Sequence, residues 1–161
     1  MPIRYLGAVI LISAALAQGA DEKYAGPRPA KPDVLYLVHA DNLIETEILT
    51  AKQEEGRNDQ TNWIPGPSSP ARTPLAEPIF LIDAQKINPD KLELYKFEVK
   101  RGRREITFPN KQGKNSPRPM RLAVRQVEGK LYRIEANETL ANGEYGLSRK
   151  GSDEVFAFQV L

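Results

Sequence analysis

Short β-type runs follow one another from Pro78 to the C-terminus, and this pattern constrains the fold more than any other feature of the chain. The runs cover residues 78–83, 92–99, 104–108, 120–127, 131–136, 144–148 and 154–160. Apolar and polar side chains alternate within most of them, which gives each expected strand one apolar face. Turn residues separate the runs, among them Glu128-Gly129 and Asn142-Gly143. Because no apolar pattern with a helical period occurs after residue 56, the sequence predicts an all-β domain over residues 78–161.

The number and length of these runs indicate the architecture. Seven short strands, each with one apolar face, are typical of two antiparallel sheets packed face to face at the size of an immunoglobulin domain. Leu92 and Leu94 are out of phase with Phe97, which predicts a bulge near Tyr95. The predicted fold class is therefore all-β, an immunoglobulin-like antiparallel β-sandwich with a proline-rich N-terminal extension and an additional hairpin.

One motif near the C-terminus carries a resemblance to known folds. The stretch Leu140-Ala141-Asn142-Gly143-Glu144-Tyr145 resembles the L-x-P-G-x-Y corner of immunoglobulin-like and prealbumin-like sandwiches, with Asn142 in place of the proline. The resemblance implies that Tyr145 opens the penultimate strand, buries its ring and directs its hydroxyl to a nearby backbone group. Leu140, Gly143 and Tyr145 are therefore expected to be structural residues, and the motif implies no activity.

The first 33 residues are expected to precede the folded domain. Arg4 is followed by an uncharged, mostly apolar run, and small residues at Ala15 and Ala17 suit cleavage after Ala17. Residues 1–17 are thus a predicted signal peptide. An uncleaved membrane anchor is the alternative, but the apolar run is too short to cross a bilayer comfortably. Residues 18–33 include the stretch GPRPAKP, which predicts a flexible lead.

Two further segments lie between this lead and the sandwich. Residues 34–55 open with the strand-like run VLYLVH and continue with a stretch whose pattern fits either a strand or a helix. We expect a β-hairpin here. Residues 56–77 are rich in proline and glycine, which predicts a loop without regular structure, either a linker or a functional loop.

Composition narrows the function and the location. The chain contains no cysteine, which excludes disulfides, thiol catalysis and lipid attachment at cysteine. Together with a signal peptide, this favours the bacterial periplasm or exterior. The net charge of +2 gives no reason to expect nucleic-acid binding.

No constellation of catalytic or metal-binding residues is evident in the sequence. His39 is the only histidine and the one candidate for a catalytic base, and with Asp41 it could also bind a metal ion. Metal sites usually need three or four ligands, however, and this pair supplies two. Ser68 and Ser69 do not match the G-x-S-x-G elbow of hydrolases. We therefore predict that the protein is not an enzyme and that it needs no metal or cofactor. The outside alternative is a hydrolase-like enzyme that uses His39.

Charge is distributed unevenly along the chain. Acids dominate residues 41–59, the acidic segment, and bases dominate residues 100–121, the basic segment. Arginine binds carboxylate and phosphate groups, although charged edges also protect sheets from aggregation. The candidate binding residues are Lys100, Arg101, Arg103, Arg104, Lys111, Lys114, Arg118 and Arg121, together with Trp63, the only tryptophan.

These observations lead to a function hypothesis with two forms. The protein is expected to act in binding or assembly, with the acidic segment of one copy meeting the basic segment of another or of a protein partner. In the alternative, the basic segment binds an anionic polysaccharide or lipid headgroup.

Overall fold

The computed structural model describes residues 23–161, and the regular secondary structure of these residues is almost entirely β-strand. The strands are β1 (Tyr36–His39), β2 (Asn42–Glu45), β3 (Glu47–Thr50), β4 (Lys52–Glu55), β5 (Asp59–Pro65), β6 (Arg72–Thr73), β7 (Ile79–Asp83), β8 (Leu92–Lys96), β9 (Glu98–Lys100), β10 (Arg103–Pro109), β11 (Leu122–Glu128), β12 (Leu131–Ala136), β13 (Gly143–Arg149) and β14 (Glu154–Val160). One 3₁₀ turn, Pro89–Lys91, precedes β8. The predicted all-β class is confirmed.

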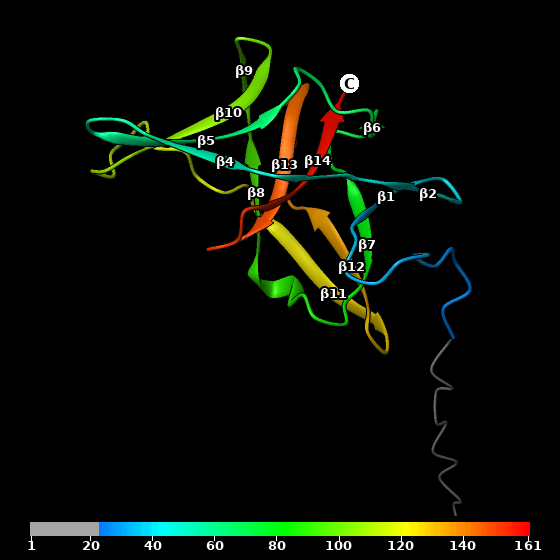
Figure 1. The fold of residues 1–161 in the computed structure, drawn as a ribbon. Helices are drawn as coiled ribbons and strands as arrows, with labels where there is room; N and C mark the ends of the chain where they lie inside the picture. The colour runs from blue at the N-terminus through cyan, green and yellow to red at the C-terminus, as the bar shows by residue number, and fades with distance from the viewer. Residues whose placement is uncertain (1–22) are drawn as a thin grey trace, which may run out of the picture.

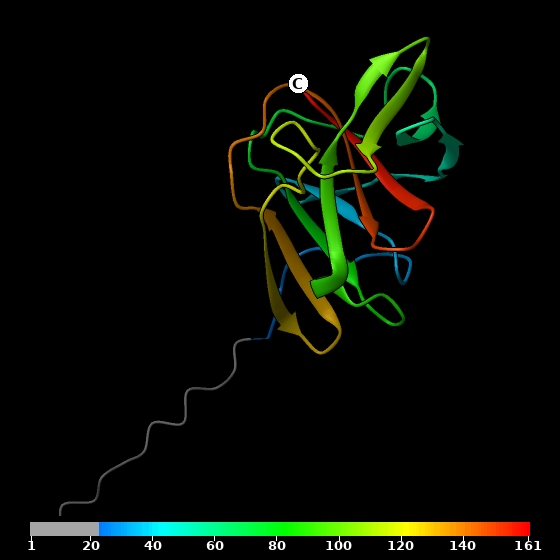
Figure 2. The ribbon, with the colours of Figure 1, turned by 90° about the vertical axis from the view of Figure 1, so that its left-hand side faces the viewer.

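The strands form three sheets, which Figure 1 shows from one side. The outer sheet has the order β11-β12-β7-β1-β2, the central sheet β3-β14-β13-β8, and the distal sheet β4-β5-β10-β9. The short strand β6 pairs in parallel with β14. Figure 2 places the β9–β10 hairpin, in light green, and the β11–β12 hairpin, in gold, at opposite ends of the molecule.

The outer and central sheets pack as a sandwich around the larger core. Phe80 of the outer sheet meets Phe158 of the central sheet edge to face, with ring centroids 5.0 Å apart. The same core buries Leu35, Leu37, Ile82, Leu94, Ile134, Leu147 and Phe156. The predicted sandwich is thus confirmed, and its apolar faces are those that the alternation of side chains indicates.

The central and distal sheets share strands and close into a ring. Only Ala51 separates β3 from β4, and only Phe97 separates β8 from β9, so each pair is one long strand that leaves the central sheet and enters the distal sheet. Around the ring, β3–β4 pairs with β14, β14 with β13, β13 with β8–β9, β9 with β10, β10 with β5, and β5 with β4. All six pairings are antiparallel, and each of the two long strands pairs with the central sheet along one half and with the distal sheet along the other. We call this arrangement the six-stranded ring.

The ring interior contains the smaller core, made from the second face of the central sheet. Val155 and Ala157 alternate along β14 with Phe156 and Phe158, so they point away from the sandwich and toward the distal sheet. They pack there with Ile64, Phe97 and Ile106. Both faces of the central sheet are therefore covered.

Three sequence predictions need correction. In the segment 34–55, only β1 and β2 form a hairpin, whereas β3 and β4 belong to the ring. The segment 56–77 contains β5 and β6 in place of the predicted loop, because all its prolines follow residue 64 and leave the preceding stretch free to pair. The break in the run at 92–99 falls at Phe97, where the strand changes sheet, and not near Tyr95.

The predicted signal peptide and residues 18–22 of the lead lie outside the described residues, but the lead from residue 23 onward docks on the outer sheet. The backbone N–H of Tyr24 donates to Glu128 Oε2 at 2.8 Å, and Arg28 forms an ion pair with the same carboxylate at 3.1 Å. Asp33 Oδ1 accepts the backbone N–H groups of Gln85, Lys86 and Ile87. These contacts fix a segment that the sequence predicts to be flexible.

Candidate functional site

The two adjacent arginines of the basic segment lie on opposite sides of the distal sheet. Neighbouring residues in a strand point to opposite faces, and β10 places Arg103 outside the ring and Arg104 inside it. Only 1% of Arg104 is exposed. Arg104 is therefore not a surface binding residue, and this part of the predicted site is wrong.

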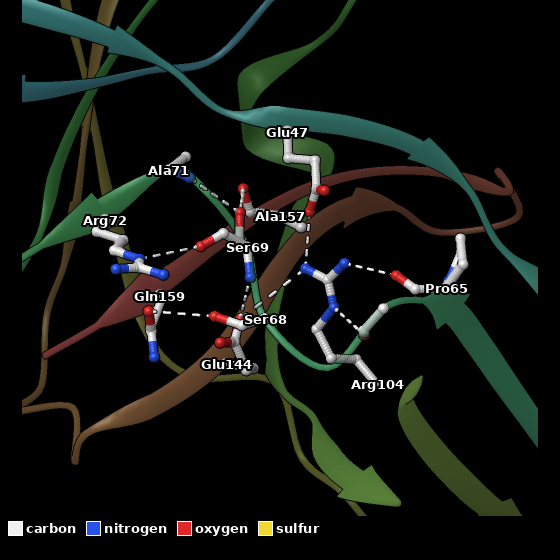
Figure 3. A network of polar contacts seen from close by, with 11 residues as sticks. Glu47, Pro65, Ser68, Ser69, Ala71, Arg72, Arg104, Glu144, Ala157 and Gln159 are labelled. Atoms are coloured by element: carbon white, nitrogen blue, oxygen red, sulfur yellow. Dashed lines mark hydrogen bonds and ion pairs between the residues drawn. The ribbon is translucent and has the colours of Figure 1, made fainter. Parts of the chain in front are cut away.

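Arg104 is the centre of a buried ion cluster (Figure 3). Its Nη1 lies 2.7 Å from Glu47 Oε1 and 3.9 Å from Glu144 Oε2. The guanidinium also donates to the carbonyls of Pro65 and Gly66 at 2.7 Å and 3.0 Å. One cation thus joins β3, β10, β13 and the end of β5 at one end of the ring. Charge-assisted hydrogen bonds of this kind are strong when they are shielded from water.

The second carboxylate of this cluster is only partly satisfied. Glu144 is 4% exposed, and its Oε2 accepts the backbone N–H of Ser69 at 3.1 Å. Its Oε1 has no hydrogen-bond partner among the described residues. The Ser69 hydroxyl donates to the carbonyl of Ala157 at 3.2 Å, so the loop after β5 is tied to β13 and β14. Ser69 thus serves to hold this loop.

Arg103 and Trp63 form a second cluster on the outside of the ring. Arg103 donates to Glu54 at 2.8 and 2.9 Å and to Glu105 at 2.8 Å. Its guanidinium lies 4.6 Å from the centroid of the Trp63 ring, and Lys52 Nζ lies 5.0 Å from the same centroid. The hydrogen bond from Arg103 lowers the pKa of the Glu54 carboxyl. This arginine is therefore already occupied by partners from the same chain.

The other candidate bases divide into two groups. Lys100 pairs with Glu98 at 2.7 Å, and Arg121 lies 3.5 Å from Glu138. Four bases are exposed and form no ion pair with any residue of 23–161: Arg101, Lys111, Lys114 and Arg118. The predicted basic patch is thus reduced to these four side chains.

The structural role predicted for Tyr145 is confirmed. Tyr145 is 1% exposed, and its hydroxyl donates to the carbonyl of Ala141 at 2.7 Å. Its ring stacks on Phe158 with centroids 5.7 Å apart. Gly143 opens β13 with φ of 154°, and Leu140 is buried in the larger core. The motif fixes the corner into the penultimate strand.

The end of the ring opposite the ion cluster is open and contains a cleft of about 350 Å³. The aromatic side chains of Tyr95, Phe97 and Phe108 border it, and Tyr95 and Phe108 meet edge to face at 5.5 Å. The other lining residues include Ala51, Asn62, Trp63, Glu93, Ile106, Gln112, Ser148, Arg149, Lys150, Ser152 and Val155. A concave site of this size that combines aromatic and polar lining groups has the dimensions of a small-molecule site.

A glycine makes the wall of the cleft possible. A Cβ at Gly146 would lie 2.6 Å from a Phe97 ring carbon and 2.8 Å from Val155 Cγ1. Glycine is thus required by space, because the Phe97 ring rests directly on β13.

The polar groups at the cleft include one pair of side chains that are hydrogen-bonded to each other. The Tyr95 hydroxyl donates to Glu93 Oε2 at 2.6 Å, and burial together with this carboxylate raises the pKa of Tyr95. His39 is exposed at the end of β1 in the outer sheet, so it is distant in the fold from the serines of the cleft. Within residues 23–161, no group of three or more His, Cys, Asp or Glu side chains could hold a metal ion.

Sequence reasoning named Trp63 but missed Tyr95, Phe108 and Gln112. The alternation along β8 and β10 shows that these aromatic residues share a face with other apolar residues, but not that this face borders an opening.

Among residues 23–161, no helix is long and apolar enough to cross a membrane. Comparisons of the chain with protein-family models, with curated proteins and with solved structures found no match.

Proposed function

We propose that the protein is a non-enzymatic binding module and that the cleft at the open end of the six-stranded ring is its ligand site. The observation that carries the proposal is the combination of half-buried aromatic rings, Tyr95 and Phe108, with polar side chains in one concave site of about 350 Å³. Such a combination supplies apolar contact and directional hydrogen bonds together.

The rigidity of the ring supports this proposal. Six antiparallel pairings close the ring, the Arg104 cluster closes its other end, and Phe97 packs against Gly146 without space to move inward. A preformed site loses little conformational entropy when a ligand binds. The closed ring therefore serves as a scaffold for the cleft.

Anilinonaphthalene sulfonate, an apolar dye that fluoresces in apolar sites, tests the cleft directly. We expect saturable fluorescence with the folded protein and energy transfer from Trp63, the only tryptophan, which belongs to the cleft wall although its ring lies beside Arg103 on the outer face. Ser148→Phe should fill the cleft and abolish the fluorescence. Thr107→Phe adds the same ring on the outer face of β10 and should leave it unchanged. Equal dye binding by both variants, or no binding by the folded wild type, would overturn the proposal.

The four exposed bases favour a second candidate, the binding of an anionic glycan or lipid headgroup. Replacing Arg101, Lys111, Lys114 and Arg118 with serine should abolish retention on a heparin column. Retention that stays unchanged would eliminate this candidate. Arg104 is excluded from the set because its loss would disturb the fold.

The assembly hypothesis is weakened by the ion pairs within one chain. Glu47 of the acidic segment pairs with Arg104, and Glu54 pairs with Arg103, so the two charged segments meet inside the monomer. Salt-sensitive oligomers in sedimentation experiments would restore the hypothesis, and a monomer at low salt and high concentration would remove it.

Export completes the proposed function, and residues 1–17 carry this part of it. N-terminal sequencing of the protein from the cells that make it should show a chain that begins at Gln18. A chain that retains Met1 in the cytoplasm would contradict export.

A further inference from the structure

We infer that the ligand of the cleft is a sugar, specifically the pyranose rings of a disaccharide or of a glycan end. This inference rests on the proposed function, since it concerns the same cleft. It goes further by stating the chemical class that the lining residues fit.

The size of the cleft sets the number of rings. An enclosed apolar cavity of about 150 Å³ holds one benzene molecule, and the cleft measures about 350 Å³. It therefore accommodates two six-membered rings. The opening lies at the end of the ring, where a longer glycan can extend into solvent.

The polar side chains match hydroxyl groups. Each sugar hydroxyl both donates and accepts, and side-chain amides and hydroxyls do the same. Asn62 uses only its carbonyl, which accepts from Gln60 at 3.2 Å, so its NH₂ group is available. Gln112 and Ser148 make no side-chain hydrogen bond within residues 23–161. Three two-sided hydrogen-bonding groups thus face the cleft with unused capacity.

The aromatic residues match the other side of a sugar. A pyranose ring presents C–H groups on its faces and hydroxyls around its edge, so one face packs on an aromatic ring while the edge is hydrogen-bonded. Tyr95 and Phe108 remain partly exposed at the cleft, and Tyr95 is held in place by its hydrogen bond to Glu93. They are the stacking residues in this arrangement.

Charge favours a neutral ligand. The bases at the cleft are Arg149 and Lys150, and the acid is Glu93. Arg149 also lies 3.9 Å from Glu154, which offsets its charge. The cleft therefore has no strong excess of either sign, and a neutral sugar suits it better than a polyanion.

Isothermal titration of the full mature chain with a panel of disaccharides tests the inference. The panel contains α- and β-linked pairs of glucose, galactose, mannose, xylose and N-acetylglucosamine, with sorbitol as an acyclic polyol control. We expect at least one disaccharide to bind with a Kd of about 1 mM or tighter, to displace the dye and to bind more tightly than its monosaccharide. Sorbitol should not bind.

Variants separate stacking from hydrogen bonding. Tyr95→Ala should weaken the sugar about tenfold, whereas Tyr95→Phe should retain most of the affinity because it keeps the ring. Gln112→Ala, in an exposed loop, should weaken binding without affecting the fold, and Thr107→Ala on the outer face should have no effect.

The failures of the two proposals are distinguishable. If the dye binds in the cleft and no disaccharide binds or displaces it, the cleft is a site but the sugar assignment is wrong. If a disaccharide binds equally well to Ser148→Phe, it binds elsewhere, and the assignment is again wrong. If neither dye nor sugar binds the folded protein, both proposals fail.

Discussion

Replacing Arg104 with methionine tests the central physical argument, because Arg104 is the one cation of the buried cluster. Methionine has a similar length and packs in apolar surroundings, but it cannot neutralise a carboxylate. The substitution leaves Glu47 and Glu144 without their guanidinium, and the carbonyls of Pro65 and Gly66 without their donor. Removing one partner of a buried ion pair costs about 3–5 kcal/mol, which is a large part of the 5–15 kcal/mol that a typical domain has in total.

Urea denaturation measures this loss. With a slope of about 2 kcal/mol per M, the unfolding midpoint of Arg104→Met should fall by about 2 M. The matched control is Arg103→Met, which removes the adjacent arginine from the outside of the ring, where one of its two carboxylate partners, Glu54, is 53% exposed and regains water. This control should lose distinctly less stability. An equal loss in the two variants, or an unchanged midpoint for Arg104→Met, would refute the argument.

A rescue experiment separates charge from packing. Adding Glu47→Gln and Glu144→Gln to Arg104→Met removes the uncompensated charges, and about half of the lost stability should return. If the triple variant is no more stable than the single one, the loss comes from packing around the methionine and not from buried charge.

Three further predictions concern other parts of the chain. Gly146→Ala should destabilise the protein by about 1–3 kcal/mol in urea denaturation, because the new Cβ collides with Phe97, and wild-type stability would contradict the tight contact. Tyr145→Phe should cost about 1 kcal/mol through the lost hydrogen bond to Ala141 while dye binding in the cleft stays unchanged. The Tyr24 N–H and Arg28 lower the pKa of Glu128, so the docking of Tyr24 and Arg28 should be complete above the ordinary pKa of about 4.3 and lost as the pH falls through the lower folded value. The NMR chemical shift of the Tyr24 amide should change as this contact is lost. In Glu128→Gln, the Tyr24 amide should already have its low-pH shift at neutral pH. If the wild type and Glu128→Gln have the same Tyr24 shift at neutral pH, the docking contact is disproved.

Local sequence was a good guide to the strands and to the corner. The run 131–136 coincides with β12 and the run 154–160 with β14, because alternation of apolar and polar side chains follows directly from the two-residue repeat of a strand. The Tyr145 motif was equally readable, since the hydroxyl bonds a carbonyl only four residues away. Both features depend on residues that are close in the chain.

The sequence could not reveal the six-stranded ring or the cleft. Ring closure depends on pairings such as β5 with β10 and β3 with β14, which join segments far apart in the chain, and no local pattern specifies such a register. Alternation shows that Arg103 and Arg104 occupy opposite faces, but only the partner strands decide which face is enclosed.

The sequence by itself therefore determined an all-β chain, the positions of most strands and the structural role of Tyr145. Tertiary structure decided that two strands cross between sheets at Ala51 and Phe97, that Arg104 is buried with Glu47, and that the opposite end of the ring stays open. The physical reason is the range of the interactions: side-chain periodicity and corner hydrogen bonds act within a few residues, whereas enclosure arises only when distant strands meet.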